Sequence, residues 1–434
     1  MFVLITVQKL IADITKDIRK PGIAKIDIAK WSFNMNRFHQ VRSCKFPPAS
    51  TVIIPALLIP WLLCIFPSPA CGGKAAIKIA AIYSYSGSLA EANADSVRGV
   101  RMAVKEINAA GGLLGRRLEL LEIDNLGTPI GSRMAALEAD RDKVAAIIGA
   151  AFSTHSIAIA RVAQDHGIPM ITNISTSPQV TRIGDCIFRV CYNDRLQGDV
   201  MGRFAREELK IRTVVTVFNL ASDYSLGLSS TFEKAFLDAG GALLAKLPYT
   251  TKQPNFRDLI DRIKSIKPDA IFIAGHGESA RIILEAAREH VYSIPLGGDG
   301  WDDERFTRLG GDKIKLGYYT THWSPFIESK LSRQFVDRHG KGGRLRPSTV
   351  LAYDAVNLLA DAITRAGTAR REKIREALAA TRDFKGVSGT ITFDEFGDPV
   401  KNVVIMKIQD GQRFYLKQVN SGKNIKTATL RFLN

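Results

Sequence analysis

The chain has 434 residues, of which 46% are hydrophobic and 24% are charged. This ordinary globular composition excludes disorder, a collagen-like repeat or a coiled coil as the main architecture, and the length predicts two or three domains. Lys and Arg outnumber Asp and Glu by 60 to 43, but the basic residues are scattered and are not interleaved with aromatic residues. We therefore expect a generally basic surface and no nucleic-acid partner.

The N-terminal segment has the pattern of an export signal. Residues 51–66 form an uncharged apolar block, which is shorter than the roughly 20 residues that span a membrane and is the longest such block in the chain. Basic residues precede it and small residues follow it, an order typical of a secretory signal. We predict that residues 1–75 are a leader and that translation starts at Met35.

The leader ends at a cysteine. The segment Cys71-Gly72-Gly73 resembles the end of a bacterial lipoprotein signal, whose cysteine becomes lipidated, although Ser68 stands where such motifs usually carry Leu. We therefore predict lipidation at Cys71. A signal that is cleaved without lipidation, and a single membrane anchor that stays uncut, are the two alternatives.

Two further cysteines, Cys186 and Cys191, lie in the body of the chain. Five positions separate them, so their side chains would lie on opposite faces of a single strand. We predict two free thiols, with a disulfide as the alternative in an exported protein. Two cysteines without a nearby histidine do not make a structural zinc site, so no metal site is expected.

From residue 76 onward, short apolar segments alternate with segments of helical periodicity. The expected strands are residues 77–83, 118–124, 144–150, 168–172, 213–218, 242–249, 270–275 and 294–299. The expected helices are residues 91–109, 132–140, 155–165, 197–208, 225–238, 256–265 and 279–289. Such alternation predicts an α/β fold with two doubly wound lobes, each built on a parallel sheet.

The alternation stops late in the chain. Two consecutive helices are expected at 348–366 and 371–380, followed by a β-ribbon with a turn at Asp410-Gly411. We expect the helices to return to the first lobe and the ribbon to join the second, so that three segments form a hinge beside a cleft. The predicted division is a leader at 1–75, a first lobe of 76–192 plus 325–382, and a second lobe of 193–324 plus 383–434.

Several stretches carry a resemblance to a known family. They include IKIAAIYSYSG, VRGVRMAVKEINAAGG, IFRVCYND, AYDAVNLLADAI and GVSGTITFDEFGDP. Over residues 76–418 the chain resembles the type I periplasmic solute-binding proteins of branched-chain amino acid ABC transporters. The resemblance implies a monomer without cofactors that closes on a small solute and docks on an inner-membrane ABC permease. It also implies a location in the periplasm or, if lipidated, on the outer face of the cytoplasmic membrane.

Hydroxyl side chains follow two expected strands of the first lobe. Ser153 and Thr154 stand at the start of a helix, at the carboxyl edge of a parallel sheet, where anions bind. Ser175 and Thr176 follow the next strand, and a helix expected to begin at Ser177 would leave both facing the cleft. The alternative for Ser153 is a simple helix cap.

In the resembled family, the equivalents of Ser153 and Thr176, with the backbone near Ile174, hold the ligand carboxylate. Asp299 falls on the family's amine-binding acid, and Tyr224 matches a tyrosine that packs on the ligand from the second lobe. The alternatives are an ordinary turn aspartate for Asp299 and an ordinary helix-start aromatic for Tyr224.

Two departures from the family bear on the solute. His276 stands where the family often has Tyr, and it either contacts the ligand or is a solvated loop residue. Near Ala92 and Asn93, some leucine binders place an aromatic side chain over the side-chain pocket. We therefore expect a preferred side chain that is larger or more polar than leucine.

An enzyme is the first competing class. The chain has no HExxH helix, GxSxG elbow or Walker loop, and His155 beside Ser153 lacks an identifiable orienting acid. We expect no enzymatic activity and no catalytic residue. The preferred function is the extracytoplasmic solute-binding component of an ABC importer for an amino acid or related solute. The alternative is a sensing domain that reports solute occupancy to a separate signalling partner.

Overall fold

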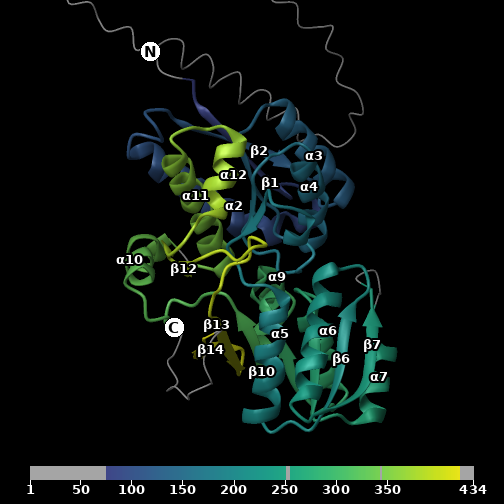
Figure 1. Ribbon diagram of the computed structural model, residues 1–434. Helices are drawn as coiled ribbons and strands as arrows, with labels where there is room; N and C mark the ends of the chain where they lie inside the picture. Colours follow the sequence, from purple (N-terminus) through teal and green to yellow (C-terminus); the bar gives the residue numbers. More distant parts are fainter. Residues whose placement is uncertain (1–74, 251–254, 343–344, 421–434) are drawn as a thin grey trace, which may run out of the picture. The chain divides into compact units, whose positions relative to one another are not determined.

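The computed structural model describes residues 75–250, 255–342 and 345–420, which all belong to one compact unit, Cys71–Asn434 (Figure 1). The predicted leader, with Met35 and Cys71, lies outside the described residues. Two large sheets form the centres of two lobes within this unit. In the described part of the chain, no helix combines the length and the apolarity needed to cross a membrane.

The first lobe is built on a five-stranded parallel sheet in the order β2-β1-β3-β4-β5. The strands are β1 (Ile77–Tyr83), β2 (Leu118–Asp124), β3 (Ala146–Gly149), β4 (Met170–Thr172) and β5 (Ile187–Arg189). Side chains alternate between two cores along β1: Ile79 and Ala81 point into one, whereas Ala80 and Ile82 point into the other. Both faces of this sheet are therefore buried, as its nearly continuous apolar strands predict.

Helices cover both faces of the first sheet. One core lies against α3 (Pro129–Arg141) and α4 (Ser153–Asp165). The other lies against α2 (Ala90–Ala109), α11 (Pro347–Ala366) and α12 (Arg371–Ala379). The two late helices thus return to the first lobe, as expected from the sequence. A Cβ atom on Gly99 of α2 would lie 2.1 Å from the carbonyl oxygen of Thr349, so glycine allows α2 and α11 to pack closely.

The second lobe contains a seven-stranded sheet in the order β14-β13-β10-β9-β8-β6-β7. Its parallel strands are β6 (Thr213–Asn219), β7 (Ala242–Tyr249), β8 (Ala270–Ala274), β9 (Ile294–Gly297) and β10 (Leu316–Thr321). The antiparallel strands β13 (Val403–Gln409) and β14 (Gln412–Val419) extend one edge, with their turn at Asp410-Gly411 as expected. The predicted α/β class with parallel-sheet lobes is confirmed.

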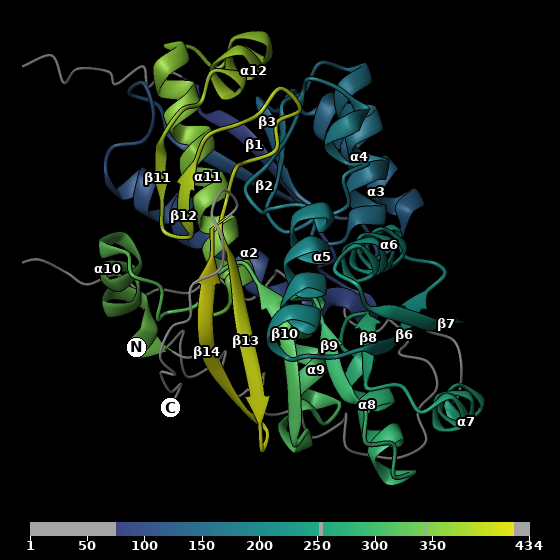
Figure 2. The same cartoon turned by 60° about the horizontal axis from the view of Figure 1, so that its bottom comes forward.

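The helices of the second lobe also lie on both faces of their sheet (Figure 2). One face packs against α5 (Asp194–Arg203), which continues as a π-helical turn at Phe204–Glu208, and α6 (Asp223–Asp238). The other face packs against α7 (Arg257–Ile266), α8 (Ser279–Arg288) and the short α9 (Glu304–Arg308). Loops leave the carboxyl ends of the parallel strands and lead into helices or turns. These loops hold the candidate site.

The observed division of the chain differs from the expected one at two places. Helix α10 (Lys330–His339) follows residue 325, yet its Phe335 packs in a core of the second lobe. The small ribbon of β11 (Phe384–Gly386) and β12 (Gly389–Ile391) lies beside α11, and Phe393 packs on Phe188 with ring centroids 5.2 Å apart (Figure 2). Phe384, Ile391 and Phe393 thus pack in the core of the first lobe, whereas Val387 between the two strands packs in a core of the second lobe.

Two local expectations also have clear outcomes. No helix begins at Ser177; the chain forms a turn there, and only a 3-10 segment follows at Thr181–Ile183. Cys186 and Cys191 are free and buried, as preferred.

Candidate functional site

A cavity lies between the two lobes. The centre of a water molecule can occupy about 50 Å³ of it. The first lobe contributes the start of α2 and the loops after β3 and β4. The second lobe contributes the loops after β8 and β9. Because these loops leave the carboxyl ends of parallel strands, the cavity occupies the position where open α/β sheets bind ligands. Of the eight predicted ligand residues, three line the cavity: Ile174, His276 and Asp299.

Asp299 is a buried acid of the cavity wall that two side chains of the second lobe hold in place. Its side chain is 6% exposed, Gln197 Nε2 donates to Oδ1 over 3.1 Å, and His322 Nε2 lies 3.0 Å from Oδ2. Burial acts to raise the pKa of Asp299, but the hydrogen bond and charge of His322 outweigh it and lower that pKa. The carboxylate is therefore held ionised, and it has lone pairs left to accept a further donor from the cavity.

Tyr224 lies behind the cavity and supports its wall. The tyrosine ring stacks on His276 with centroids 4.8 Å apart, and its hydroxyl accepts a hydrogen bond from Gly300 N over 3.1 Å. Phe152 of the first lobe meets the His276 ring edge-on at 4.9 Å. Burial lowers the pKa of His276, so the ring is neutral near pH 7. His276 is thus a packed residue of the cavity wall that joins the two lobes.

The predicted hydroxyls of the first lobe have different environments. Ser153 begins α4 rather than capping it, and its Oγ accepts from Ser177 N over 3.1 Å. Ser175 does not face the cavity, because its hydroxyl bonds the carbonyl oxygen of Ala150 and lies 2.7 Å from Ser156 Oγ. This corrects the expectation for Ser175, whose hydroxyl satisfies nearby groups of its own lobe first.

Thr154 and Thr176 differ from both serines. Thr154 Oγ1 accepts from Asp223 N of α6 over 3.3 Å, which links the first turns of α4 and α6 across the lobes. Thr176 is fully buried, and its hydroxyl makes no well-formed hydrogen bond among the described residues, although its interaction with Asp194 acts to lower the pKa of that acid. A buried hydroxyl without a well-formed hydrogen bond is costly, so Thr176 can gain from a further partner.

A second carboxyl, Asp194, is linked to Asp299 through a shared partner. Gln197 Nε2 donates to the Oδ1 of Asp194 over 2.7 Å as well as to Asp299, so one amide joins the two acids. Burial and the charge of Asp299 raise the pKa of Asp194 to about 7. The ionised carboxyl of the cavity wall is therefore coupled to a buried carboxyl whose pKa lies near neutrality.

The sequence interpretation missed several residues that the structure brings to the site. Asp95 of α2 lines the cavity, and Arg346 bridges it to Glu304 of the second lobe. His322, which holds Asp299, follows β10 at the same sheet edge. His322 was missed because no strand was expected at residues 316–321, and Arg346 precedes α11 and carried no such signal.

His155 and the side chains that could ligate a metal bear on the enzyme and metal-site alternatives. Burial lowers the pKa of His155 to about 4, and its Nδ1 has no hydrogen-bond partner among the described residues. Over residues 75–250, 255–342 and 345–420, no group of three or more His, Cys, Asp or Glu side chains is arranged to hold a metal ion.

Comparison with known proteins agrees with this architecture. Residues 76–413 match the family described as periplasmic binding protein. A leucine-, isoleucine-, valine-, threonine- and alanine-binding protein of Pseudomonas aeruginosa is 28% identical over 74% of this chain and 87% of its own length.

Solved structures are similar as well. A leucine binding protein from Thermotoga maritima has a TM-score of 0.76 and 33% identity, covering 80% of this chain and 99% of its own. A branched-chain amino acid transporter substrate binding protein from Streptococcus pneumoniae, in complex with isoleucine, has a TM-score of 0.73 and 28% identity. It covers 78% of this chain and 97% of its own. The family match spans most of the sequence, both lobes and the cavity between them, and this chain therefore belongs to the periplasmic binding protein family.

Proposed function

We propose that this protein is the extracytoplasmic solute-binding component of an ABC importer and that it captures an amino acid or a closely related small solute between its lobes. The observation that carries the proposal is the interlobe cavity ending on the ionised, buried Asp299. An α-ammonium group is the complement of such a carboxylate. The names of the relatives agree, since they bind leucine, isoleucine and other small amino acids.

The α-carboxylate of the solute would bind the first lobe. The free N–H groups at the start of α4 favour an anion, and α4 has 13 residues. The hydroxyl protons of Ser153 and Thr176 are available beside them: Ser153 Oγ only accepts from Ser177 N, and Thr176 makes no well-formed hydrogen bond in the described chain. Ile174 would contribute its backbone and Thr154 its link to α6, while Tyr224 and His276 would close over the solute.

Periplasmic binding proteins bind solutes and do not transform them, so family membership confirms that this chain is not an enzyme. Membership also implies an extracytoplasmic location. We propose that the closed protein docks on an ABC permease as a monomer, and that Cys71 carries a lipid anchor. Radiolabelled palmitate incorporation that is lost in Cys71→Ala would support the anchor, and incorporation that persists would contradict it.

The function is tested by ligand capture. Purified full-length protein is screened by thermal shift against the twenty amino acids, small amides, urea and aromatic acids. A ligand that binds only the folded protein raises the melting temperature by mass action, and isothermal titration then gives the stoichiometry. We expect one α-amino acid to bind per chain.

The other outcomes have distinct consequences. A shift only with solutes that lack an α-ammonium group would overturn the assignment of Asp299 while leaving solute capture intact. No shift with any compound of the screen would contradict the proposed function.

A further inference from the structure

The cavity has an unexpected chemistry for a leucine site. Its walls carry five carboxyl groups: Asp95, Asp299, Asp302, Asp303 and Glu304. Apart from alanine, the only apolar side chains that line it are Ile174 and Phe152. An aliphatic solute side chain would displace water from these carboxylates without offering them a hydrogen bond, which is unfavourable.

The positive partners of these carboxyl groups are fewer than the carboxyl groups. Arg305 pairs with Asp303, and Arg413 lies 3.1 Å from Asp302. Arg346 is shared between Asp95 and Glu304. Three guanidinium groups thus contact four of the five carboxyl groups, and the fifth, Asp299, is held by His322. Because Arg346 is shared between Asp95 and Glu304, one of these two carboxylates lacks a full counter-charge of its own.

Asp95 is that carboxylate, because its contacts are long. Arg346 Nε lies 3.3 Å from Oδ2, and the hydroxyl of Thr349 lies 3.4 Å from Oδ1. Burial raises the pKa of Asp95, with Arg346 and Arg98 acting in the opposite direction. Charge-assisted hydrogen bonds are normally about 2.7–2.9 Å long. A better-placed cationic donor would therefore bond Asp95 more closely and neutralise more of its charge.

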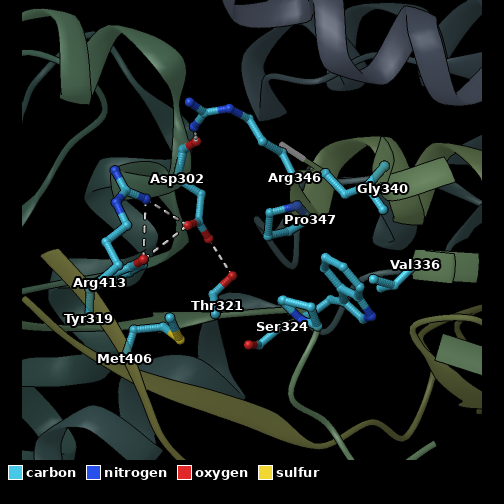
Figure 3. Close-up of a pocket in the computed structure, with 13 residues that line it drawn as sticks. Asp302, Tyr319, Thr321, Ser324, Val336, Gly340, Arg346, Pro347, Met406 and Arg413 are labelled. Carbon is cyan, nitrogen blue, oxygen red and sulfur yellow. Dashed lines mark hydrogen bonds and ion pairs between the residues drawn. The ribbon is translucent and has the colours of Figure 1, made fainter. Parts of the chain in front are cut away.

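Arg346 does not depend on Asp95 to keep its position. Its Nη1 donates to the carbonyl oxygen of Asp302 over 2.7 Å, and its Nη2 pairs with Glu304 (Figure 3). A donor that arrives from the solute can therefore replace Arg346 at Asp95 while the guanidinium group keeps its two other partners.

A second cavity shares a wall residue with the first. It has a volume of about 200 Å³ open to the centre of a water molecule, and Asp302 lines both cavities (Figure 3). Arg346 lines the larger cavity while its guanidinium group contacts Asp95 of the smaller one. Asp302 and Arg346 therefore connect the walls of the two cavities.

We infer that Asp95 determines the specificity of the site and that the preferred solute is an amino acid with a cationic side chain, of the lysine, ornithine or arginine class. This inference rests on the proposed function, since it places the α-ammonium at Asp299 and the second cation at Asp95. It assigns the solute a net positive charge, which complements the carboxyl-rich wall of the cavity.

The test compares ligands and variants by isothermal titration of the full-length protein. Wild type is expected to bind lysine, ornithine or arginine at least tenfold more tightly than leucine or isoleucine. Asp95→Ala should weaken the cationic ligand at least tenfold and change leucine binding less than threefold. Asp95→Asn, which keeps the size of the side chain, should lose most of the same preference.

A matched control is Asp361→Ala, which removes a partly exposed acid of α11 whose partner among the described residues is Arg365 of its own helix. Its affinities should equal those of wild type. Tighter binding of leucine than of every cationic amino acid would overturn the inference and leave the proposed function standing. Equal losses for leucine and the cation in both Asp95 variants would also overturn it, because Asp95 would then act on closure and not on specificity. Absence of binding by any amino acid would overturn the inference together with the proposed function.

Discussion

The two lobes bring different chemistry to the cavity. The second lobe presents Asp299 and His276 directly in the wall. The predicted residues of the first lobe are mostly hydroxyls, and those of Ser153 and Ser175 are already engaged by atoms of their own lobe. A serine near a chain turn meets unsatisfied backbone groups at once, whereas a carboxylate is held open by longer-range partners such as His322. Position after a strand therefore predicts a carboxylate in the site better than a hydroxyl.

The largest expected effect comes from the second lobe. Asp299→Ala removes the proposed partner of the solute ammonium and leaves Gln197 and His322 without their shared acceptor. Losing one member of a buried, hydrogen-bonded charge pair costs about 2–5 kcal/mol, which is about two to four decades of affinity. Titration of the best ligand from the screen checks this. Asp299→Asn keeps an acceptor for Gln197 and should show a smaller loss, whereas binding by Asp299→Ala within threefold of wild type would contradict the site.

The first lobe offers a neighbouring pair that sharpens the comparison. Thr176→Val removes a buried hydroxyl without a well-formed hydrogen bond in the described chain, while Ser175→Ala removes one that is bonded to Ala150. If Thr176 donates to the solute carboxylate, its loss should weaken binding by about 1.5–3 kcal/mol, since that hydrogen bond involves a charge. Ser175→Ala should instead lower the free energy of unfolding by about 1 kcal/mol and leave affinity nearly unchanged.

Titration gives the affinities for this pair, and urea denaturation gives the stabilities. Equal affinity losses in the two variants would show that the lobe tightens as a whole and that neither hydroxyl contacts the solute.

A glycine beside Asp299 provides a third test. A Cβ atom on Gly300 would lie 2.4 Å from the carbonyl oxygen of Gly275 and 3.0 Å from both His276 Nδ1 and the Tyr224 hydroxyl. Gly300→Ala should therefore shift the loop that carries Asp299, at a cost of about 1–3 kcal/mol in stability. We expect a lower melting temperature and a clearly weaker affinity. Gly367→Ala is the matched control. Gly367 has a φ of 63°, so an alanine there would strain the backbone, but it lies at the end of α11, and the substitution should affect stability alone.

A last prediction is a pH dependence from Asp194. Its pKa is about 7 in the folded protein and about 3.9 in an unfolded chain, so the folded state binds more protons between these values. The free energy of unfolding therefore falls as the pH rises from about 4 to 7. Asp194→Asn keeps an acceptor for Gln197 and removes this titration.

The melting temperature of Asp194→Asn relative to wild type should thus rise between pH 4 and pH 8. A difference that stays constant with pH would mean that Asp194 has an ordinary pKa. Because Asp299 raises the pKa of Asp194, an ammonium bound at Asp299 should also release protons near pH 7. Titrations in two buffers with different ionisation enthalpies measure that release.

The sequence by itself determined the fold class, the family and the positions of most strands, although β5 and β10 were not expected. Its apolar strands alternate with helices, and this pattern predicts parallel sheets whose two faces are both covered by helices. It also placed Asp299, His276 and Ile174 at strand ends that meet in one cavity. These features depend on local periodicity and on a topological rule, and both can be recognised in the amino-acid sequence.

Only the tertiary structure decided the rest. The ribbon at 384–391 packs on the first lobe because its apolar face matches α11, and no local pattern encodes that choice. Arg346, Asp95 and Glu304 lie far apart in the sequence and meet only where the lobes face each other. Charge balance within a cavity is a property of groups brought together by the fold, so the sequence predicted an amino acid site while the structure indicates which side chain that site prefers.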